Sequence, residues 1–168
     1  IDPSDHQLWV RVIDYKSGKH TFSFSNLLYG LDMQMLIYLA TLLQPGTPLE
    51  HAKPAGILYD PVGILKKDLK REEKISIDQH INDSYRMSGI LLDNVPLIRK
   101  METGNSGTYL PIIEQNEGLK GKENGILLNE MEFQQLFQYM KQKVIDMAES
   151  VFHGKIEAAP LQLNSSMQ

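Results

Sequence analysis

The chain has 168 residues, a length typical of one domain and sufficient for a sizeable core. Its composition, 42% hydrophobic and 23% charged, is that of an ordinary globular protein. A net charge of −4 excludes a generally basic protein, so any contact with nucleic acid must come from a local basic patch. Cysteine is absent, which excludes disulfides and thiolate metal sites within this chain and agrees with a cytoplasmic location.

No apolar run approaches the roughly 18 residues that cross a bilayer, and no signal-peptide pattern is present. We therefore expect no contact with a membrane. The chain opens on Ile1 without an initiator methionine and closes on the polar residues 164–168. We expect residues 1–168 to be a single domain, truncated at both ends, of a longer protein.

A strand is predicted over residues 8–14, where apolar side chains alternate at the period of two that a pleated ribbon imposes. Continued onward, this alternation places Asp14 and Lys16 on the same side of the strand, before Ser17 and Gly18 turn the chain. An acid and a lysine in this arrangement can hold a divalent cation and stabilise the charge that develops beside it. This pair is the chemical clue in the sequence.

A second element, a helix, is predicted over residues 26–43, with Ser25 or Asn26 as its cap. It is apolar nearly all round, which indicates a helix buried against a sheet. Gln34 and Tyr38 are exceptions with polar heads. They are four residues apart and therefore share a face of the helix.

Residues 55–59 form a short apolar run that predicts an interior strand. Residues 66–74 hold a basic cluster diluted by acids, which is either a contact with the DNA backbone or a solvated helix face. The other elements expected before residue 126 are a helix from Ser76 or Asp78 to about Met87, an apolar run over 89–92, a short helix over 95–101, a strand over 109–113 and a flexible charged stretch over 117–125.

The final helix has the clearest signals. Asn129 is at an N-cap position, and Glu132 lies three residues on, in a capping-box arrangement. Apolar residues then repeat at three- and four-residue steps as far as Val151, and Gly154 supplies the stop. We expect an amphipathic helix of about six turns whose Met and Phe stripe belongs to the core.

The runs VIDYKSG, YGLDMQMLIYL and PAGILY, with the later SYRMSGILLDN and HGKIEAAPLQL, resemble the nuclease domain at the C-terminal end of AddB/RexB-type subunits of bacterial helicase–nucleases. Those nucleases belong to the RecB-like branch of the PD-(D/E)XK superfamily, and the resemblance covers nearly the whole chain. It implies an α/β restriction-endonuclease-like fold with a mixed sheet flanked by helices. We expect residues 8–14 to be central in that sheet, with the helices over 26–43 and 130–153 against it.

The resemblance also implies roles for individual residues. The carboxylate of Asp14 would bind Mg²⁺ or Mn²⁺, and the backbone carbonyl of Tyr15 would be a further ligand, because hard cations prefer oxygen. Lys16 would orient or help activate the attacking water and stabilise the charge on the scissile phosphate. Gln34 and Tyr38 would line the site and position phosphate or water. The alternative for these two is capping and packing against the sheet.

The family needs another acidic residue on the preceding strand, in an Ile-Asp context, and Asp2 is the candidate in this chain. Where two Ile-Asp steps occur in the family, the first Asp is catalytic, so the ligand can instead lie upstream of Ile1. A Glu or His on an upstream helix completes the family's metal site and is not in this chain. Many AddB proteins also hold an iron–sulfur cluster through cysteines outside this segment. The absence of cysteine leaves open truncation or a RexB-like protein without the cluster.

The resemblance implies a metal-dependent exonuclease that hydrolyses DNA single strands supplied by an AddA/RexA-type helicase partner during recombinational repair of double-strand breaks. One alternative is a non-catalytic DNA-binding or partner-docking module. Another is a structural domain in which the acid–lysine pair is a surface ion pair worth under about 1 kcal/mol. No phosphate-binding Gly-x-x-x-x-Gly-Lys motif is present, which excludes ATP handling of that type. The histidines lack metal-ligand spacing and are expected at the surface: His6, His20, His51, His80 and His153.

Overall fold

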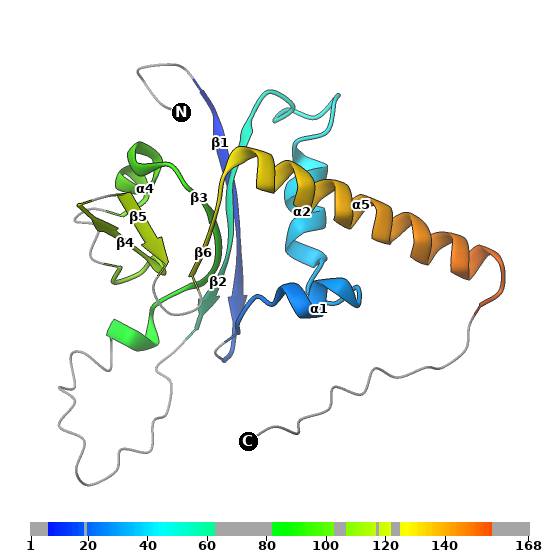
Figure 1. Ribbon diagram of the computed structural model, residues 1–168, viewed down its shortest axis with the longest axis horizontal. Helices are drawn as coiled ribbons and strands as arrows, with labels where there is room; N and C mark the ends of the chain where they lie inside the picture. Colours follow the sequence, from blue (N-terminus) through cyan, green and yellow to red (C-terminus); the bar gives the residue numbers. More distant parts are fainter. Residues whose placement is uncertain are drawn as a thin grey trace, which may run out of the picture.

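The computed structural model describes residues 7–18, 20–62, 82–102, 107–116, 118–121 and 125–155. Asp2 and the basic cluster over 66–74 lie outside the described residues. Within the described part, a mixed sheet carries helices α1, α2 and α5 on one face and helix α4 with a small second sheet on the other (Figure 1). The elements are β1 (Trp9–Lys16), α1 (Phe24–Leu28), α2 (Gln34–Leu42), β2 (Lys53–Pro61), β3 (Ser88–Leu92), α4 (Val95–Met101), β4 (Ile112–Gln115), β5 (Gly118–Gly121), β6 (Gly125–Leu128) and α5 (Glu130–Phe152).

The main sheet has the strand order β1-β2-β3-β6. β1 and β2 are parallel, β2 and β3 antiparallel, and β3 and β6 parallel, which confirms the expected mixed sheet. β2 is interior, as expected for residues 55–59. β1 was expected to be central but lies at the edge of the sheet within the described residues, because β2 is its one pairing partner there. Its partly buried side chains agree with an edge position.

Alternate residues of the strands send side chains to two cores, as the period of two predicts. On the α2 and α5 side, Val10 and Val12 pack against a buried cluster that includes Leu36 and Phe133. On the opposite side, Ile13 packs against a smaller cluster built around Leu58, Leu91, Ile98, Leu110 and Ile112. Asp14 and Lys16 continue the Val10–Val12 side, so they emerge on the face that α2 covers.

The helix expected over residues 26–43 is two helices, because the backbone between them is left-handed. Gly30 has a φ of 79° and Asp32 a φ of 56°, and neither value fits a continuous right-handed helix. Ser23 caps α1, with its side chain accepting a hydrogen bond from the amide of Asn26, so the expected cap at Ser25 or Asn26 was wrong. The apolar pattern continues across the break between α1 and α2, so the break could not be predicted from that pattern.

The second half of the chain follows the predictions in part. Helix α4 has the expected bounds and is capped by the side chain of Asn94. The helix expected to reach Met87 stops earlier, since the residues just before β3 are not helical. β4 begins three residues later than the strand expected from residue 109. The stretch over 117–125, expected to be flexible, contains β5, which pairs antiparallel with β4. β6 was not predicted.

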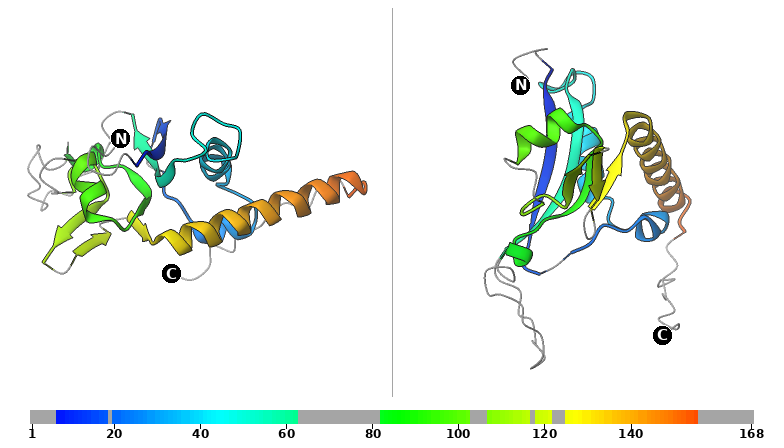
Figure 2. Two further views of the ribbon diagram at one scale, coloured as in Figure 1. Left: turned by 90° about the horizontal axis from the view of Figure 1, so that it is seen from above. Right: turned by 60° about the vertical axis from the view of Figure 1, so that its left-hand side comes forward.

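Helix α5 confirms the predicted capping box. The side chain of Asn129 accepts from the amide of Glu132 at 2.9 Å, and the Glu132 carboxylate accepts from the amide of Asn129 at 2.8 Å. Phe133, Leu136 and Met140 are buried, but farther along the apolar side chains are exposed, Phe152 by 87%. The second half of α5 extends beyond the sheet (Figure 2), so the expected core stripe holds for its first half. In the described ranges, no helix is long and apolar enough to cross a membrane.

Close pairing of β2 with β3 depends on glycine. A Cβ on Gly56, where φ is 152°, would collide with the carbonyl oxygen of Ile90 and approach the Leu91 side chain to 2.8 Å. We predict that Gly56→Ala lowers the free energy of unfolding by about 2–3 kcal/mol, because backbone atoms in the sheet centre cannot yield. Urea denaturation of the 168-residue chain measures this effect. Gly18→Ala is the matched control, since nothing lies within 4 Å of a Cβ there. Equal unfolding midpoints for the two variants would contradict the predicted clash.

Candidate active site

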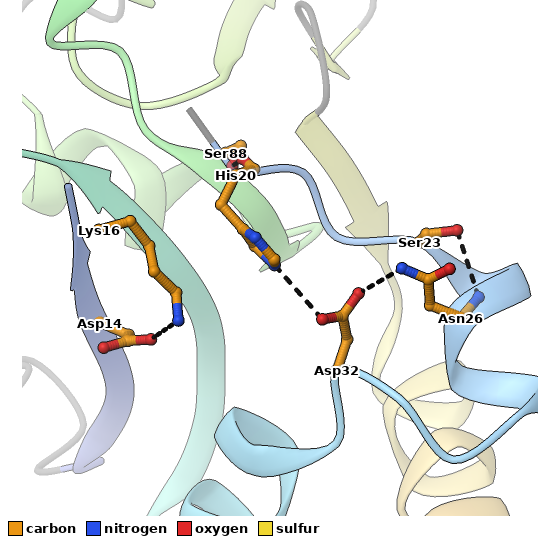
Figure 3. A network of polar contacts seen from close by, with 7 residues as sticks. All are labelled: Asp14, Lys16, His20, Ser23, Asn26, Asp32 and Ser88. Carbon is orange, nitrogen blue, oxygen red and sulfur yellow. Dashed lines mark hydrogen bonds and ion pairs between the residues drawn. The ribbon is translucent and has the colours of Figure 1, made fainter. Parts of the chain in front are cut away.

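Asp14 and Lys16 meet at the end of β1, as their alternation predicted. Lys16 Nζ lies 2.7 Å from Asp14 Oδ2 (Figure 3). The side chains of Lys16 and Asp14 are 34% and 31% exposed, so the pair is partly open to solvent at the strand end. The strand therefore presents a carboxylate and an ammonium together, on the face that α2 covers.

Tyr59 adjoins this pair because of the strand register. The parallel pairing of β1 and β2 sets Asp14 opposite Tyr59, and Lys16 Nζ lies 5.6 Å from the centre of the Tyr59 ring, a cation–π distance. Tyr59 is 3% exposed. Burial, followed by the negative charges of Asp32 and Asp14, raises the pKa of Tyr59 to about 12. Its hydroxyl therefore stays protonated and adds no negative charge to the site.

A polar network around His20 and Asp32 lies just before α2 (Figure 3). The edge of the His20 ring packs on Tyr59, with 4.3 Å between ring centres, and His20 Nε2 lies 3.4 Å from Asp32 Oδ1. Asp32 Oδ2 accepts a hydrogen bond of 2.8 Å from Asn26 Nδ2. The hydroxyl of Ser88 donates to the backbone carbonyl of His20, which fixes this segment to β3.

Sequence reasoning did not find this network. The prediction that His20 is a surface residue was wrong, since its side chain is 32% exposed and its Nε2 atom is buried. His20 and Asp32 are brought together by a turn and a short helix, and their separation in the chain matches no recognised motif. Tyr59 was expected as a strand residue without a place in the site. The one signal that could have marked Asp32 is its position just after a glycine-containing turn, where Asp tolerates left-handed backbone.

Gln34 and Tyr38 share one face of α2, as expected. Gln34 Nε2 donates to the Tyr38 hydroxyl at 2.8 Å, and the Tyr38 side chain is exposed. In the part of the chain that the structure describes, no hydrogen bond or ion pair joins these two residues to Asp14 or Lys16. The structure thus brings the four predicted residues together as two pairs, one on β1 and one on α2.

The donor set for a cation is partial within the described ranges. They contain no group of three or more His, Asp or Glu side chains that could hold a metal ion. The Asp14 carboxylate and the adjoining Tyr15 backbone carbonyl are hard oxygen donors. Mg²⁺ keeps several waters and is commonly held by one or two carboxylates together with substrate phosphate. The residues present fit such a cation as part of its ligand shell.

The high pKa of Tyr59 yields a titration test. Because the pKa is raised from its ordinary value of 10.0 to about 12, the folded chain holds this proton after the unfolded chain has lost it. The resulting stability is fully present below about pH 10 and is lost as the pH rises toward about 12. We predict that Tyr59→Phe flattens the decline in unfolding free energy between about pH 10 and pH 12, measured by denaturation at each pH. The unsubstituted chain is the reference, and a decline of the same steepness in Tyr59→Phe would contradict the assignment.

Comparison with known proteins agrees with this geometry. Residues 1–163 match the family model of the PD-(D/E)XK nuclease superfamily. The chain is 31% identical over 160 residues to an ATP-dependent helicase/deoxyribonuclease subunit of Clostridium kluyveri, with 90% of this chain and 14% of that protein aligned. It is 34% identical over 161 residues to the subunit of the same name from Caldanaerobacter subterraneus, with 92% of this chain and 14% of that protein aligned.

These alignments confirm the similarity to a bacterial helicase–nuclease subunit that the motifs indicated. The chain spans about one seventh of the length of these relatives. The family model matches nearly all residues of the chain. The sheet between helices and the acid–lysine pair at the end of β1 agree with that match. The chain belongs to the PD-(D/E)XK nuclease superfamily.

Proposed function

We propose that this chain is the nuclease domain of an AddB/RexB-type helicase–nuclease subunit and that it hydrolyses phosphodiester bonds of DNA. The observation that carries the proposal is the contact between Asp14 and Lys16 at the end of β1, in a member of a nuclease superfamily. The relatives' name, helicase/deoxyribonuclease, supports DNA as the substrate. Because those relatives extend far beyond the aligned part, the proposal concerns this domain within a larger protein.

Mg²⁺ or Mn²⁺ is the proposed cofactor, since PD-(D/E)XK nucleases generally use divalent metal ions. Asp14 and the Tyr15 carbonyl would hold it, and Asp2 or an acid upstream of Ile1 would add a ligand. When bound, the cation supplies Lewis-acid stabilisation of phosphate charge and activates water. An iron–sulfur cluster in the parent protein would take its ligands from other segments, as this chain has no cysteine.

Lys16 has the proposed role of stabilising charge on the scissile phosphate and orienting the attacking water. Its ammonium is already within 2.7 Å of the carboxylate at which the cation would bind. A fixed positive group in a partly enclosed site stabilises developing negative charge more than one in open water. Tyr59, neutral and packed below the ammonium, limits the positions that Lys16 can take. Gln34 and Tyr38 supply an amide and a hydroxyl that can bind a phosphate oxygen or water.

In its setting, we propose an exonuclease that acts on single strands delivered by an AddA/RexA-type helicase partner, in the cytoplasm, during recombinational repair of double-strand breaks. The second candidate is a non-catalytic module that binds DNA or a partner. The absence of a metal-ligand cluster among the described residues favours it, and an inactive outcome in the experiments below would support it.

Two substitutions test the catalytic proposal in the full-length protein, assembled with a partner whose own nuclease activity has been removed. We predict that Asp14→Asn and Lys16→Met each lower the rate of DNA degradation at least about 100-fold, because each removes a charge required at the phosphate. Strand degradation is measured alongside ATP-driven unwinding, which should remain. The matched controls are Asp146→Asn and Lys53→Met, at charged residues elsewhere. Degradation at the unaltered rate in Asp14→Asn would refute the assignment.

Removal of divalent cations separates the two candidate functions. The assay supplies single-stranded DNA, so that cleavage does not depend on unwinding. Because the proposed catalysis requires the metal, we predict that a chelator stops cleavage of these strands. DNA binding, measured by fluorescence anisotropy, should persist. Restored Mg²⁺ or Mn²⁺ should recover cleavage in the native protein and not in Asp14→Asn. A native protein that binds single strands but never cleaves them with either metal would favour the non-catalytic module.

A further inference from the structure

Asp32 has an unusual backbone conformation just before the start of α2. Its φ of 56° is left-handed, and within the described ranges it is the one residue other than glycine with a positive φ. Left-handed backbone is costly for most residues and persists where surrounding contacts determine it. Asp32 stands immediately before Met33, the N-cap of α2, and two residues before Gln34. Whatever holds Asp32 therefore also sets where α2 begins.

Two side chains from different elements lie against the Asp32 carboxylate, Asn26 through a hydrogen bond and His20 through a longer contact. Asn26, in α1, donates to Oδ2 at 2.8 Å, and His20, in the segment after β1, brings Nε2 to 3.4 Å from Oδ1. The Asp32 side chain is 16% exposed, so these contacts lie in a shielded environment. Met33 has no side-chain capping bond of its own, which leaves the fixing of this helix start to its neighbours.

The other end of the network lies against the acid–lysine pair. The His20 ring packs on Tyr59, whose ring lies 5.6 Å from Lys16 Nζ and whose backbone pairs with Asp14. The hydroxyl of Ser88 anchors the His20 backbone to β3. Through Tyr59, contacts thus run from Lys16 on β1 to His20 and on to Asp32 before α2. Figure 3 shows the two ends of this set, the Asp14–Lys16 pair and the group around Asp32.

We propose that Asp32, held by Asn26 and adjoined by His20, is a positioning residue that fixes the first turn of α2, and with it Gln34, beside the Asp14–Lys16 pair. The inference rests on the proposed function. The two functional pairs have no direct bond in the described residues, so their spacing depends on the packing of α2 and on this network. Misplacement of a catalytic group by about 1 Å can cost up to about 100-fold in rate.

The test uses the full-length protein with its nuclease-deficient partner and compares Asp32→Gly, Asp32→Asn, Gln34→Ala and the double variant Asp32→Gly with Gln34→Ala. Glycine accepts a left-handed backbone, so Asp32→Gly removes the carboxylate without the strain that alanine would add. We expect kcat to fall about tenfold in Asp32→Gly, with KM nearly unchanged. Asp32→Asn keeps an oxygen for Asn26 and tolerates the same φ, so it should recover most of kcat.

The double-mutant cycle separates positioning from general stability. If Asp32 acts through Gln34, the double variant should be no slower than Gln34→Ala alone, whatever melting temperature Asp32→Gly loses. Multiplicative losses, full kcat in Asp32→Gly, or full kcat in Gln34→Ala would each overturn the inference while leaving the proposed function in place. Cleavage at the native rate in Asp14→Asn would overturn both.

Discussion

The parallel pairing of β1 with β2 is the constraint on which the rest of the site depends. Parallel neighbours cannot be joined by a tight turn, so the chain must cross over one face of the sheet before it returns. Here the crossover contains α1 and α2 and covers the face on which Asp14 and Lys16 emerge. The same pairing sets Asp14 opposite Tyr59. The register of this strand pair therefore places Asp14, Lys16 and Tyr59 near one another, and the crossover it requires brings α2 over the same face.

The charges in this region contribute little to stability, and the proposed function gives them a chemical role. A partly exposed ion pair such as Asp14–Lys16 contributes little to the free energy of folding. Burial keeps Tyr59 neutral, so a carboxylate and an ammonium remain as the accessible groups of β1 at this point. Such a pair offers an oxygen to a hard cation and a positive group to a phosphate. Membership of the nuclease superfamily supports the proposed role of both groups at a scissile phosphate.

Features that depend on a few neighbouring residues could be predicted from the sequence. The alternation of residues 8–14 placed Asp14 and Lys16 together, and the capping box located the start of α5. The division of the expected helix was missed because its apolar pattern continues while Gly30 and Asp32 turn the backbone. The edge position of β1 and the contact between His20 and Asp32 depend on how distant segments cross, which no short window of sequence contains. The proposed roles of Gln34 and Tyr38 come from the family resemblance and not from local pattern.

Paramagnetic broadening by Mn²⁺ gives the most direct test that the end of β1 and the start of α2 form one metal-dependent site. Backbone amide signals would be followed by NMR as Mn²⁺ is added to the isotope-labelled chain. Signals of Asp14, Lys16 and Tyr59 should broaden first, followed by Gln34, while those of α4 on the opposite face of the sheet stay sharp. Broadening that begins elsewhere, or that persists unchanged in Asp14→Asn, would contradict a cation site at the end of β1.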